Sequence, residues 1–237
     1  MAEFFGGGSQ DSSMTQAQLE ETARFMQRVY GWMAVALVIS GATAYYVSYD
    51  SELTKMIFAN GLFIPLILLE LGLVMGLSWL INKMSANVAV ALFILYSFVT
   101  GLTLSVIFLA YKLDSIVSIF GVSALIFGSM SLYGYYTKKD LTGIGTLAFF
   151  GLIGIIIAGL VNLFIGSSLV SFVVSIIWVI VFIALTAYDT QKIKEMNILG
   201  NEWTEDDTKE AVLWALTLYL DFINLFLNLL RLFGSRK

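Results

Sequence analysis

The chain of 237 residues contains no cysteine and no histidine, and this absence excludes several classes of functional site. Zinc sites of the Cys/His type, thiol nucleophiles, Ser-His-Asp triads and haem ligation by histidine all need one of these residues. Histidine-based pH switching is excluded for the same reason. Carboxylates are then the only side chains left that titrate near neutral pH. We expect no cofactor, and any bound cation should be calcium, magnesium, sodium or a proton, because carboxylates and backbone carbonyls are hard oxygen ligands.

Charged residues are scarce, at 13% of the chain, whereas hydrophobic residues make up 59% and the mean hydropathy is +0.87. Soluble domains carry about 25% charged residues. Long apolar runs fill the chain from Gly31 to Gly234, and they lack the alternation that is typical of outer-membrane strands. Each run suits a helix that crosses a bilayer core of about 30 Å. The sequence therefore predicts an all-α integral membrane protein, a bundle of seven helices at 31–48, 57–81, 87–110, 115–136, 144–165, 169–188 and 211–233.

The first 29 residues are polar and precede the first apolar run. They do not resemble a cleavable signal peptide, so the first helix should remain as an anchor. We expect residues 1–24 to form a disordered cytoplasmic tail and residues 25–237 to form a single membrane domain.

Lysine and arginine are enriched in cytoplasmic loops near helix ends, so their positions predict the orientation of the chain. With the N-terminus inside, Lys55 and Lys112 fall in outer loops. Eight basic residues fall on the inner side, namely Arg24, Arg28, Lys83, Lys138, Lys139, Lys192, Lys194 and Lys209. This bias favours a cytoplasmic N-terminus. Seven full crossings would place Arg231, Arg236 and Lys237 outside, so either the last segment does not fully cross or the first six helices decide the orientation.

The second run contains the only proline, Pro65, which we interpret as a local kink. Gly72 and Gly76 lie one helical turn apart in the same run and could let a neighbouring helix approach closely. The glycines of the fifth run, Gly151, Gly154 and Gly159, favour the same packing role. None of these residues identifies a functional site.

Three acidic residues fall within or at the end of apolar runs: Glu70 in the second, Asp189 at the end of the sixth and Asp221 within the seventh. An ionised carboxylate at bilayer depth costs about 2.5 to 3.5 kcal/mol on insertion scales, so such residues are functional candidates by default. For Glu70, a packing role as a protonated or hydrogen-bonded group is an equal alternative. The two aspartates are the stronger candidates.

The seventh run carries a stripe of polar side chains, which we call the polar seam. Its members alternate at spacings of three and four residues, as along one face of a helix: Trp214, Thr217, Asp221, Asn224, Asn228 and Arg231. Such a stripe cannot face lipid, so the last helix should lie centrally or line a hydrated path for ions. The alternative is a purely structural seam of hydrogen bonds between helices.

The depths of the two aspartates decide whether they can meet. Asp221 lies about ten residues into its predicted helix, or ~15 Å from the inner end. Asp189 lies near the inner end of the sixth run, so the two meet only if that helix extends further inward or the seventh starts lower. Two carboxylates within hydrogen-bonding range at a low-dielectric site cannot both ionise cheaply, so such a pair would share a proton and respond to pH.

Acidic residues also cluster between the sixth and seventh runs, at Glu195, Glu202, Glu205, Asp206, Asp207 and Glu210. They lack the spacing of an EF-hand calcium loop. We interpret this cluster as a solvated surface.

Two stretches, LTAYDTQKIK at 185–194 and LTLYLDFINLFLNLLRLFG at 216–234, resemble the signature of the transmembrane Bax inhibitor motif family. The stretches FMQRVYGWM at 25–33, LYSFVTGLTLS at 95–105 and SLYGYYTKKDLTGIG at 131–145 are similar to bacterial members. The resemblance covers nearly the whole chain from Phe25. It implies an integral protein of the bacterial cytoplasmic (inner) membrane.

The resemblance further implies six helices around a central seventh and a pH-sensitive calcium leak. It assigns the pH-sensing pair, where the passing calcium would bind, to Asp189 and Asp221. In the family, an arginine at the inner end of helix two latches onto the helix-six acid. The matching residue is Ile81, and only Lys83 lies near as a looser substitute. The expected partners are the lipid bilayer, calcium ions and protons, and no nucleic acid.

Two other functions stay open at this point. The chain could be a non-conducting regulator that binds other membrane proteins, such as a protease or a component of a stress response. An intramembrane aspartyl protease also pairs aspartates on two helices, but the second acid lies in Tyr219-Leu220-Asp221 rather than in Gly-x-Gly-Asp, and the Pro-Ala-Leu motif is missing. We therefore expect the chain not to be an enzyme. A retinal-type receptor is disfavoured because no lysine lies within an apolar run.

Overall fold

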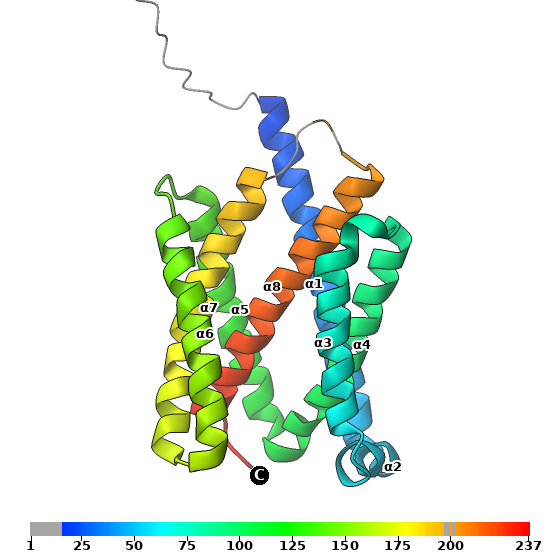
Figure 1. Cartoon of the computed structure of the whole chain (residues 1–237), viewed down its shortest axis with the longest axis vertical. Helices are drawn as coiled ribbons and strands as arrows, with labels where there is room; N and C mark the ends of the chain where they lie inside the picture. Colours follow the sequence, from blue (N-terminus) through cyan, green and yellow to red (C-terminus); the bar gives the residue numbers. More distant parts are fainter. Residues whose placement is uncertain (1–15, 197–199, 201) are drawn as a thin grey trace, which may run out of the picture.

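Long helices account for most of the computed structural model, which describes residues 16–196, 200 and 202–237 (Figure 1). The long helices are α1 (Gln16–Tyr49), α3 (Phe63–Leu80), α4 (Ala86–Ala110), α5 (Leu113–Tyr136), α6 (Thr142–Ile165), α7 (Ser168–Met196) and α8 (Glu205–Phe233). The short α2 (Ser51–Thr54), the π-helical turn η1 (Lys55–Ala59) and the 3-10 turn η2 (Ile81–Lys83) lie between them. In the described chain, seven helices are long and apolar enough to cross a membrane. The prediction of an all-α integral membrane protein with seven spans is confirmed.

The bundle has two ends, which we call the N-terminal face and the C-terminal face. The start of α1, η2 and the connection between α7 and α8 lie at the N-terminal face, at the top of Figure 1. The C-terminus lies at the opposite face, where Lys112 N donates to Ser235 O (3.0 Å) and Lys237 N donates to Ala110 O (3.1 Å). Residues 234–237 are thereby held against the connection between α4 and α5. Helix α8 therefore runs from one end of the bundle to the other.

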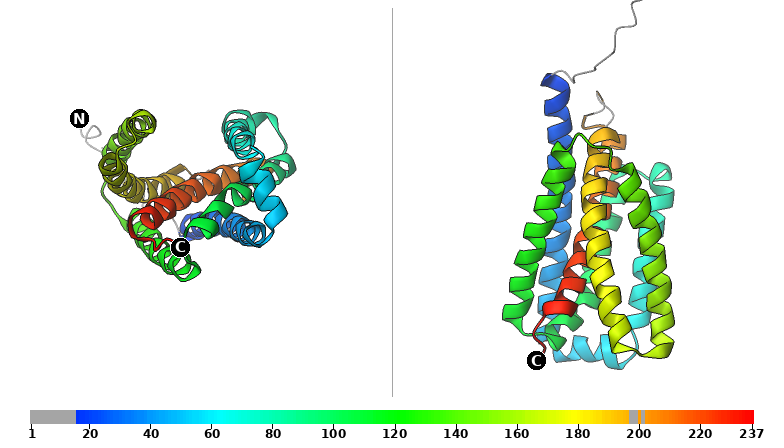
Figure 2. Two further views of the ribbon diagram at one scale, coloured as in Figure 1. Left: turned by 90° about the horizontal axis from the view of Figure 1, so that it is seen from below. Right: turned by 90° about the vertical axis from the view of Figure 1, so that its left-hand side faces the viewer.

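Helix α8 is the most buried span. In its most apolar window 67% of the residues are buried, against 50% for α4 and 28% or less for the others. It packs against α1, α4, α5 and α7, and it crosses obliquely between the other helices (Figures 1 and 2). Six helices arranged around α8 stay a prediction.

The predicted helix at 57–81 is wrong in its first part. The Asp50 side chain accepts hydrogen bonds from the backbone of Glu52 and Leu53 and so caps α2, and η1 follows directly. Gly61 then turns the chain with a φ of 83°, a conformation that favours glycine, and α3 starts at Phe63. Pro65 therefore lies in the first turn of a helix, where its missing N–H costs no hydrogen bond, and it does not kink a span.

Three helices start earlier or end later than predicted. Helix α7 continues to Met196 instead of ending at 188, and α8 starts at Glu205 instead of 211. Their polar ends stay helical because they find partners: Lys194 Nζ donates to Tyr135 O (2.9 Å), and Thr204 Oγ1 caps α8 at Asp207 N (3.2 Å). Residues 16–24, expected in a disordered tail, form the first turns of α1, while residues 1–15 lie outside the described residues.

Glycines permit the closest helix contacts, but they are not the predicted ones. A Cβ atom on Gly134 of α5 would collide with the backbone of Ala187 in α7, and one on Gly101 of α4 would lie 2.8 Å from Ser40 O of α1. At Gly72, by contrast, nothing lies within 4 Å of such an atom. The same holds for Gly76, Gly154 and Gly159, so the packing role predicted for them is wrong in this bundle, whereas Gly151 does approach Val181, at 3.2 Å.

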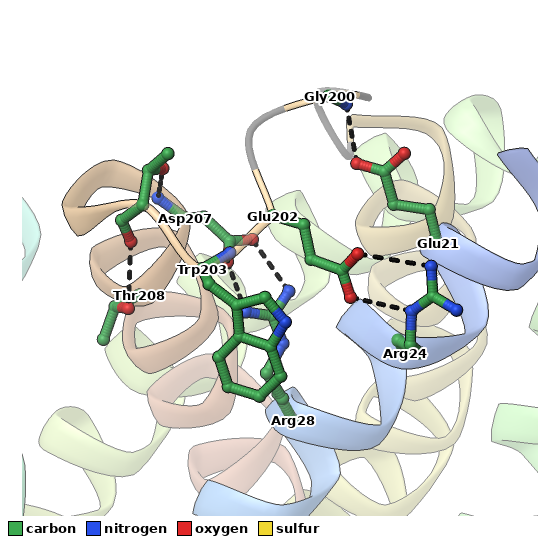
Figure 3. Close-up of polar contacts among 9 residues, drawn as sticks. Glu21, Arg24, Arg28, Gly200, Glu202, Trp203, Asp207 and Thr208 are labelled. Atoms are coloured by element: carbon green, nitrogen blue, oxygen red, sulfur yellow. Dashed lines mark hydrogen bonds and ion pairs between the residues drawn. The ribbon is translucent and has the colours of Figure 1, made fainter.

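The connection between α7 and α8 is bound to α1 by two arginines (Figure 3). Arg24 donates to both carboxylate oxygens of Glu202, at 2.7 and 3.2 Å. One turn later, Arg28 donates to both oxygens of Asp207, and the Trp203 ring stacks on the Arg28 guanidinium at 4.5 Å. The backbone N–H of Trp203 donates to the same carboxylate at 2.8 Å. The start of α8 is thus fixed to α1 by charge-assisted hydrogen bonds.

The acidic cluster between α7 and α8 is therefore not simply a solvated surface. Asp207 is 1% exposed and ion-paired, and Glu205 Oε1 accepts a hydrogen bond from Ala86 N at the start of α4 (2.9 Å). The prediction failed because the sequence does not show that Arg24 and Arg28, nearly 180 residues earlier, face these acids.

We expect Gly134→Ala to destabilise the bundle by about 1 to 3 kcal/mol, because the new methyl group must push α5 away from the α7 backbone. Thermal unfolding of the purified protein in detergent measures this effect. Gly128→Ala in the same helix is the matched control, since nothing lies within 4 Å of its Cβ position. Equal melting temperatures for the two variants would contradict the proposed contact.

Asp207→Asn should destabilise the protein by about 3 kcal/mol, because it leaves the Arg28 charge, whose side chain is 16% exposed, without its partner. Glu202→Gln breaks the corresponding pair with Arg24, which is 49% exposed, and should lower the melting temperature much less, because water screens an exposed pair. The two melting curves in detergent test this order. A loss for Glu202→Gln as large as that for Asp207→Asn would refute it.

Candidate functional site

A cavity of about 850 Å³ lies where α3 and α4 face α6 and α7, with α8 between the two pairs. Most of its wall is apolar, from residues such as Phe149, Phe182 and Leu220. Its polar lining residues come from five helices: Glu70, Tyr96, Thr146, Tyr188, Asp189, Thr217, Asp221 and Asn224. Among the described residues, neither a lysine nor an arginine lines it. The cavity therefore gathers three acids in an apolar surrounding without a basic counter-charge.

Asp189 of α7 and Asp221 of α8 meet in this cavity. Both carboxyl groups line the cavity, and each lies close enough to the other to interact electrostatically. Asp221 is 4% exposed, and its Oδ2 finds no donor among the described residues. Because ionised carboxylates only accept hydrogen bonds, a hydrogen bond between the two would need a shared proton.

Asp189 and Asp221 reach the same cavity because α7 extends further than predicted and α8 starts earlier than predicted. Asp189 lies seven residues before the end of α7, about 10 Å along the axis, rather than at the helix end. Asp221 lies sixteen residues after the start of α8, about 24 Å along that helix. The longer α7 and the oblique course of α8 bring the two positions to the same depth.

Residues around Asp189 fix this part of α7 to its neighbours. The Gln191 side chain accepts from Leu141 N and donates to Lys139 O, both at 2.8 Å, and so binds the connection between α5 and α6. Thr190 lies 3.2 Å from the Tyr30 hydroxyl of α1. The Tyr188 ring packs on Gly145, where a Cβ atom would lie 2.5 Å from it. Most of the LTAYDTQKIK stretch therefore has a structural role, and Asp189 is left to face the cavity.

A second polar contact fixes α8 two residues before Asp221. The Tyr219 hydroxyl lies 2.6 Å from Ser40 Oγ of α1, and Ser40 Oγ also lies 2.7 Å from Ser97 O of α4. Sequence reasoning missed Ser40 and Tyr219. A serine within an apolar helix was the only available signal, and serines are common there.

Glu70 enters the cavity from α3, on the wall that faces α6 and α7. Its Oε1 accepts a hydrogen bond from Thr103 Oγ1 of α4 at 2.6 Å. The same cavity holds the Tyr96 side chain beside it. Both interpretations of Glu70 therefore have a structural basis. Its hydrogen bond to Thr103 suits a packing role, and its position in the cavity wall suits a role in the site.

The polar seam is divided between two cavities. Thr217, Asp221 and Asn224 line the acidic cavity, whereas Arg231 lines a second cavity of about 660 Å³ nearer the C-terminal face. Asn228 lines neither, and it is 8% exposed. Trp214, the first member, is half-buried and lines neither cavity.

The hydrogen bonds of the seam stay within α8. Thr217 Oγ1, Asn224 Nδ2 and Asn228 Nδ2 each donate to a backbone carbonyl four residues earlier, at 3.2, 2.8 and 2.8 Å. These three bonds do not join α8 to another helix, so they do not form the hydrogen-bonded seam between helices that was the structural alternative.

Both cavities are lined by α6, α7 and α8, the acidic cavity nearer the N-terminal face and the second one nearer the C-terminal face. On α6, Ile156 lines the acidic cavity and Gly159 lines the second one. On α7, the corresponding residues are Trp178 and Ser175. Three residues of helix, about 4.5 Å, separate the two sets of lining residues on α6 and on α7, whereas seven residues, about 10 Å, separate Asn224 from Arg231 on α8. Asn228 lies between these last two residues along the seam.

Lys83 does not join the candidate site. It lies exposed in η2 at the N-terminal face, is not among the cavity residues, and forms no ion pair within the described part of the chain. The structure therefore does not bring the predicted latch to Asp189. Lys192, one turn after Asp189, pairs instead with Glu195 at 3.4 Å.

Tight metal binding is not indicated by the donor set. Among the described residues, no group of three or more acidic side chains is placed to hold a metal ion. Calcium takes six to eight oxygen ligands in typical sites, and the Asp189–Asp221 pair supplies at most four. A cation at this pair would be held weakly, as passage of ions requires.

Comparison with known proteins places the chain in a family. The family described as "Inhibitor of apoptosis-promoting Bax1" matches residues 22–237. The inner membrane protein YbhL of Escherichia coli strain K12 is 50% identical over 218 residues, which cover 90% of this chain and 92% of that protein. An uncharacterized protein of Borreliella burgdorferi is 47% identical over 215 residues, covering 90% and 93% of the two chains.

A third relative is an uncharacterized protein of Deinococcus radiodurans, which is 41% identical over 228 residues, or 96% of this chain and 97% of its own. The family match begins within α1 and continues to the C-terminus, so its range covers the positions of both aspartates of the cavity. The chain therefore belongs to the Bax inhibitor-1-like family of integral membrane proteins.

Proposed function

We propose that the chain is a passive calcium leak whose rate is set by protonation of the Asp189–Asp221 pair. The observation that carries the proposal is the proximity of these two carboxyl groups in a cavity that no basic residue of the described ranges lines. A proton can satisfy the pair, and so can a cation. The two compete for the same oxygen atoms, so pH and cation binding are coupled.

The groups that face the pair support this competition. Glu70 and Tyr96 face it from α3 and α4, and Tyr188 lies beside it on α7. Lys192 lies 5.8 Å from the Tyr188 ring but is engaged with Glu195. The nearby acid favours a cation in the cavity, and no basic side chain lines it to replace that cation. At acidic pH a shared proton should displace calcium and reduce the flux.

The position of Asn228 supports a gated path. The lining residues of the acidic cavity and of the second cavity are about one helical turn apart on α6 and α7, and on α8 Asn228 lies between them. Protonation changes the repulsion between Asp189 and Asp221, which lie on α7 and α8 themselves. The sensor and the barrier therefore involve the same pair of helices.

The orientation belongs to the same proposal. With α8 crossing the whole bundle, the N-terminal face carries eight of the thirteen basic residues and the C-terminal face carries five. We infer that the N-terminal face is cytoplasmic, in the inner membrane. The chain would then act as a channel and not as an enzyme.

Asp221→Asn should abolish most of the pH dependence of calcium flux, because an amide cannot share the titrating proton. The measurement is calcium uptake by liposomes that contain only lipid and the purified protein, at acidic and neutral pH. We expect a several-fold higher rate at neutral pH for the unchanged protein and nearly equal rates for the variant.

Asp114→Asn, an exposed acid at the start of α5, is the matched control and should keep the normal pH profile. Asp189→Asn should behave like Asp221→Asn. A folded Asp221→Asn protein with an unchanged pH profile would rule out the sensor. A folded, unchanged protein that passes no calcium at any pH would rule out the leak and would favour the non-conducting regulator.

Asn228→Ala should raise the calcium flux several-fold at neutral pH, because it removes the side chain that lies between the two cavities. Asn228→Leu, at the same position, replaces the amide with an apolar group and should lower the flux below that of the unchanged protein. The same liposome assay measures both variants. Equal flux in the two variants would show that the path does not pass this residue.

A further inference from the structure

The second cavity has a different chemistry from the acidic one. It lies between the α6–α7 hairpin and the end of α8, and its volume is about 660 Å³. Two arginines, Arg231 and Arg236, line it, and no acidic residue of the described ranges does. Within the described part of the chain, neither arginine forms an ion pair. The C-terminal face therefore carries a concave site with two uncompensated positive charges.

Both arginines are held by the fold. Arg231 lies in the last turn of α8. Arg236 belongs to the C-terminal residues that are bound to the α4–α5 connection: it pairs as an isolated β-bridge with Tyr111, and its guanidinium lies 5.9 Å from the Tyr111 ring. Ser235 N also donates to Ser115 Oγ of α5 at 2.9 Å. The second arginine is thus presented from an anchored segment.

The opposite wall supplies neutral hydrogen-bonding groups. Ser168, Ser171 and Asn162 line the cavity, and Asn162 Nδ2 donates to Ser171 Oγ at 2.7 Å, which leaves the Ser171 hydroxyl hydrogen for another acceptor. Ser168 is also the first residue of α7, where backbone N–H groups and the helix dipole favour an anion. Arginines, hydroxyls and amides together are the groups that bind phosphate oxygens in proteins.

The surroundings favour a lipid as the source of the phosphate. The cavity is several times larger than a phosphate ion needs, and Leu163 and Phe172 form part of its wall. Phe164, next to this wall at the end of α6, is 93% exposed, and Leu169 at the start of α7 is 70% exposed. Such residues face acyl chains in a membrane protein, and a headgroup would then lie at the depth of the arginines.

We propose that this second cavity binds the phosphate of an anionic lipid headgroup between Arg231 and Arg236. The apolar wall receives the upper part of the lipid, and the hydroxyl groups of α7 complete the contacts to the phosphate. This site is separate from the Asp189–Asp221 pair and does not depend on ion conduction.

The test is a thermal-shift titration of the full chain in a neutral detergent. The probes are a short-chain phosphatidylglycerol, a phosphatidylcholine of the same chain length, and inorganic phosphate. Phosphatidylglycerol should raise the melting temperature saturably, with phosphatidylcholine and inorganic phosphate weaker. Arg231→Gln/Arg236→Gln should weaken the apparent affinity for phosphatidylglycerol at least about tenfold, as expected for the loss of charge-assisted hydrogen bonds.

Lys55→Gln/Lys112→Gln is the matched control, because it removes two exposed charges from the same face outside the cavity and should leave the affinity unchanged. If the double glutamine variant does not fold, Arg231→Lys/Arg236→Lys keeps the charge but loses the forked geometry and should bind several-fold more weakly. Binding of phosphatidylglycerol that is equal in the arginine variants and the unchanged protein would overturn the proposal. The proposal would also be overturned if inorganic phosphate raised the melting temperature as much as phosphatidylglycerol and displaced it, since the site would then bind a free anion.

Discussion

The placement of Asp189 and Asp221 in one apolar cavity imposes the strictest electrostatic constraint on the bundle. Two carboxyl groups in an apolar surrounding repel each other when both are ionised, and no basic side chain lines their cavity to relieve this. The pair can persist only if other contacts hold α7 and α8 at this distance. Gln191 binds α7 to the α5–α6 connection and Lys194 binds it to the last turn of α5, while Tyr219 and Asp207 bind α8 to α1.

These supporting contacts share one feature, since each of them joins segments that lie far apart in the chain. Arg28 reaches Asp207, and Ser40 reaches Tyr219, over 179 residues in both cases. Helix α1 therefore serves as a frame along which α8 is fixed at two depths. Only the middle of α8, with Asp221 and Asn224, faces the cavity rather than a helix that holds it.

Much of the fold follows from the sequence because hydropathy and helix length are local properties. The seven spans, the polar seam and the two aspartates were visible without the structure. The end of α7 and the start of α8 were not, because residues such as Lys194 and Asp207 are polar and stay helical only through distant partners. The arginine contacts of α1 and the close approach of Gly134 to α7 depend on tertiary packing, which periodicity does not encode.

The charges along α8 set opposite conditions at the two ends of the proposed path. Arg231 follows Asp221 by ten residues, about 15 Å along the helix, and Arg236 lines the same terminal cavity. A calcium ion that leaves the acidic cavity toward the C-terminal face would approach two positive charges, which repel it. An anionic headgroup between these arginines would offset them, so the lipid and the aspartate pair would control two successive barriers on one path.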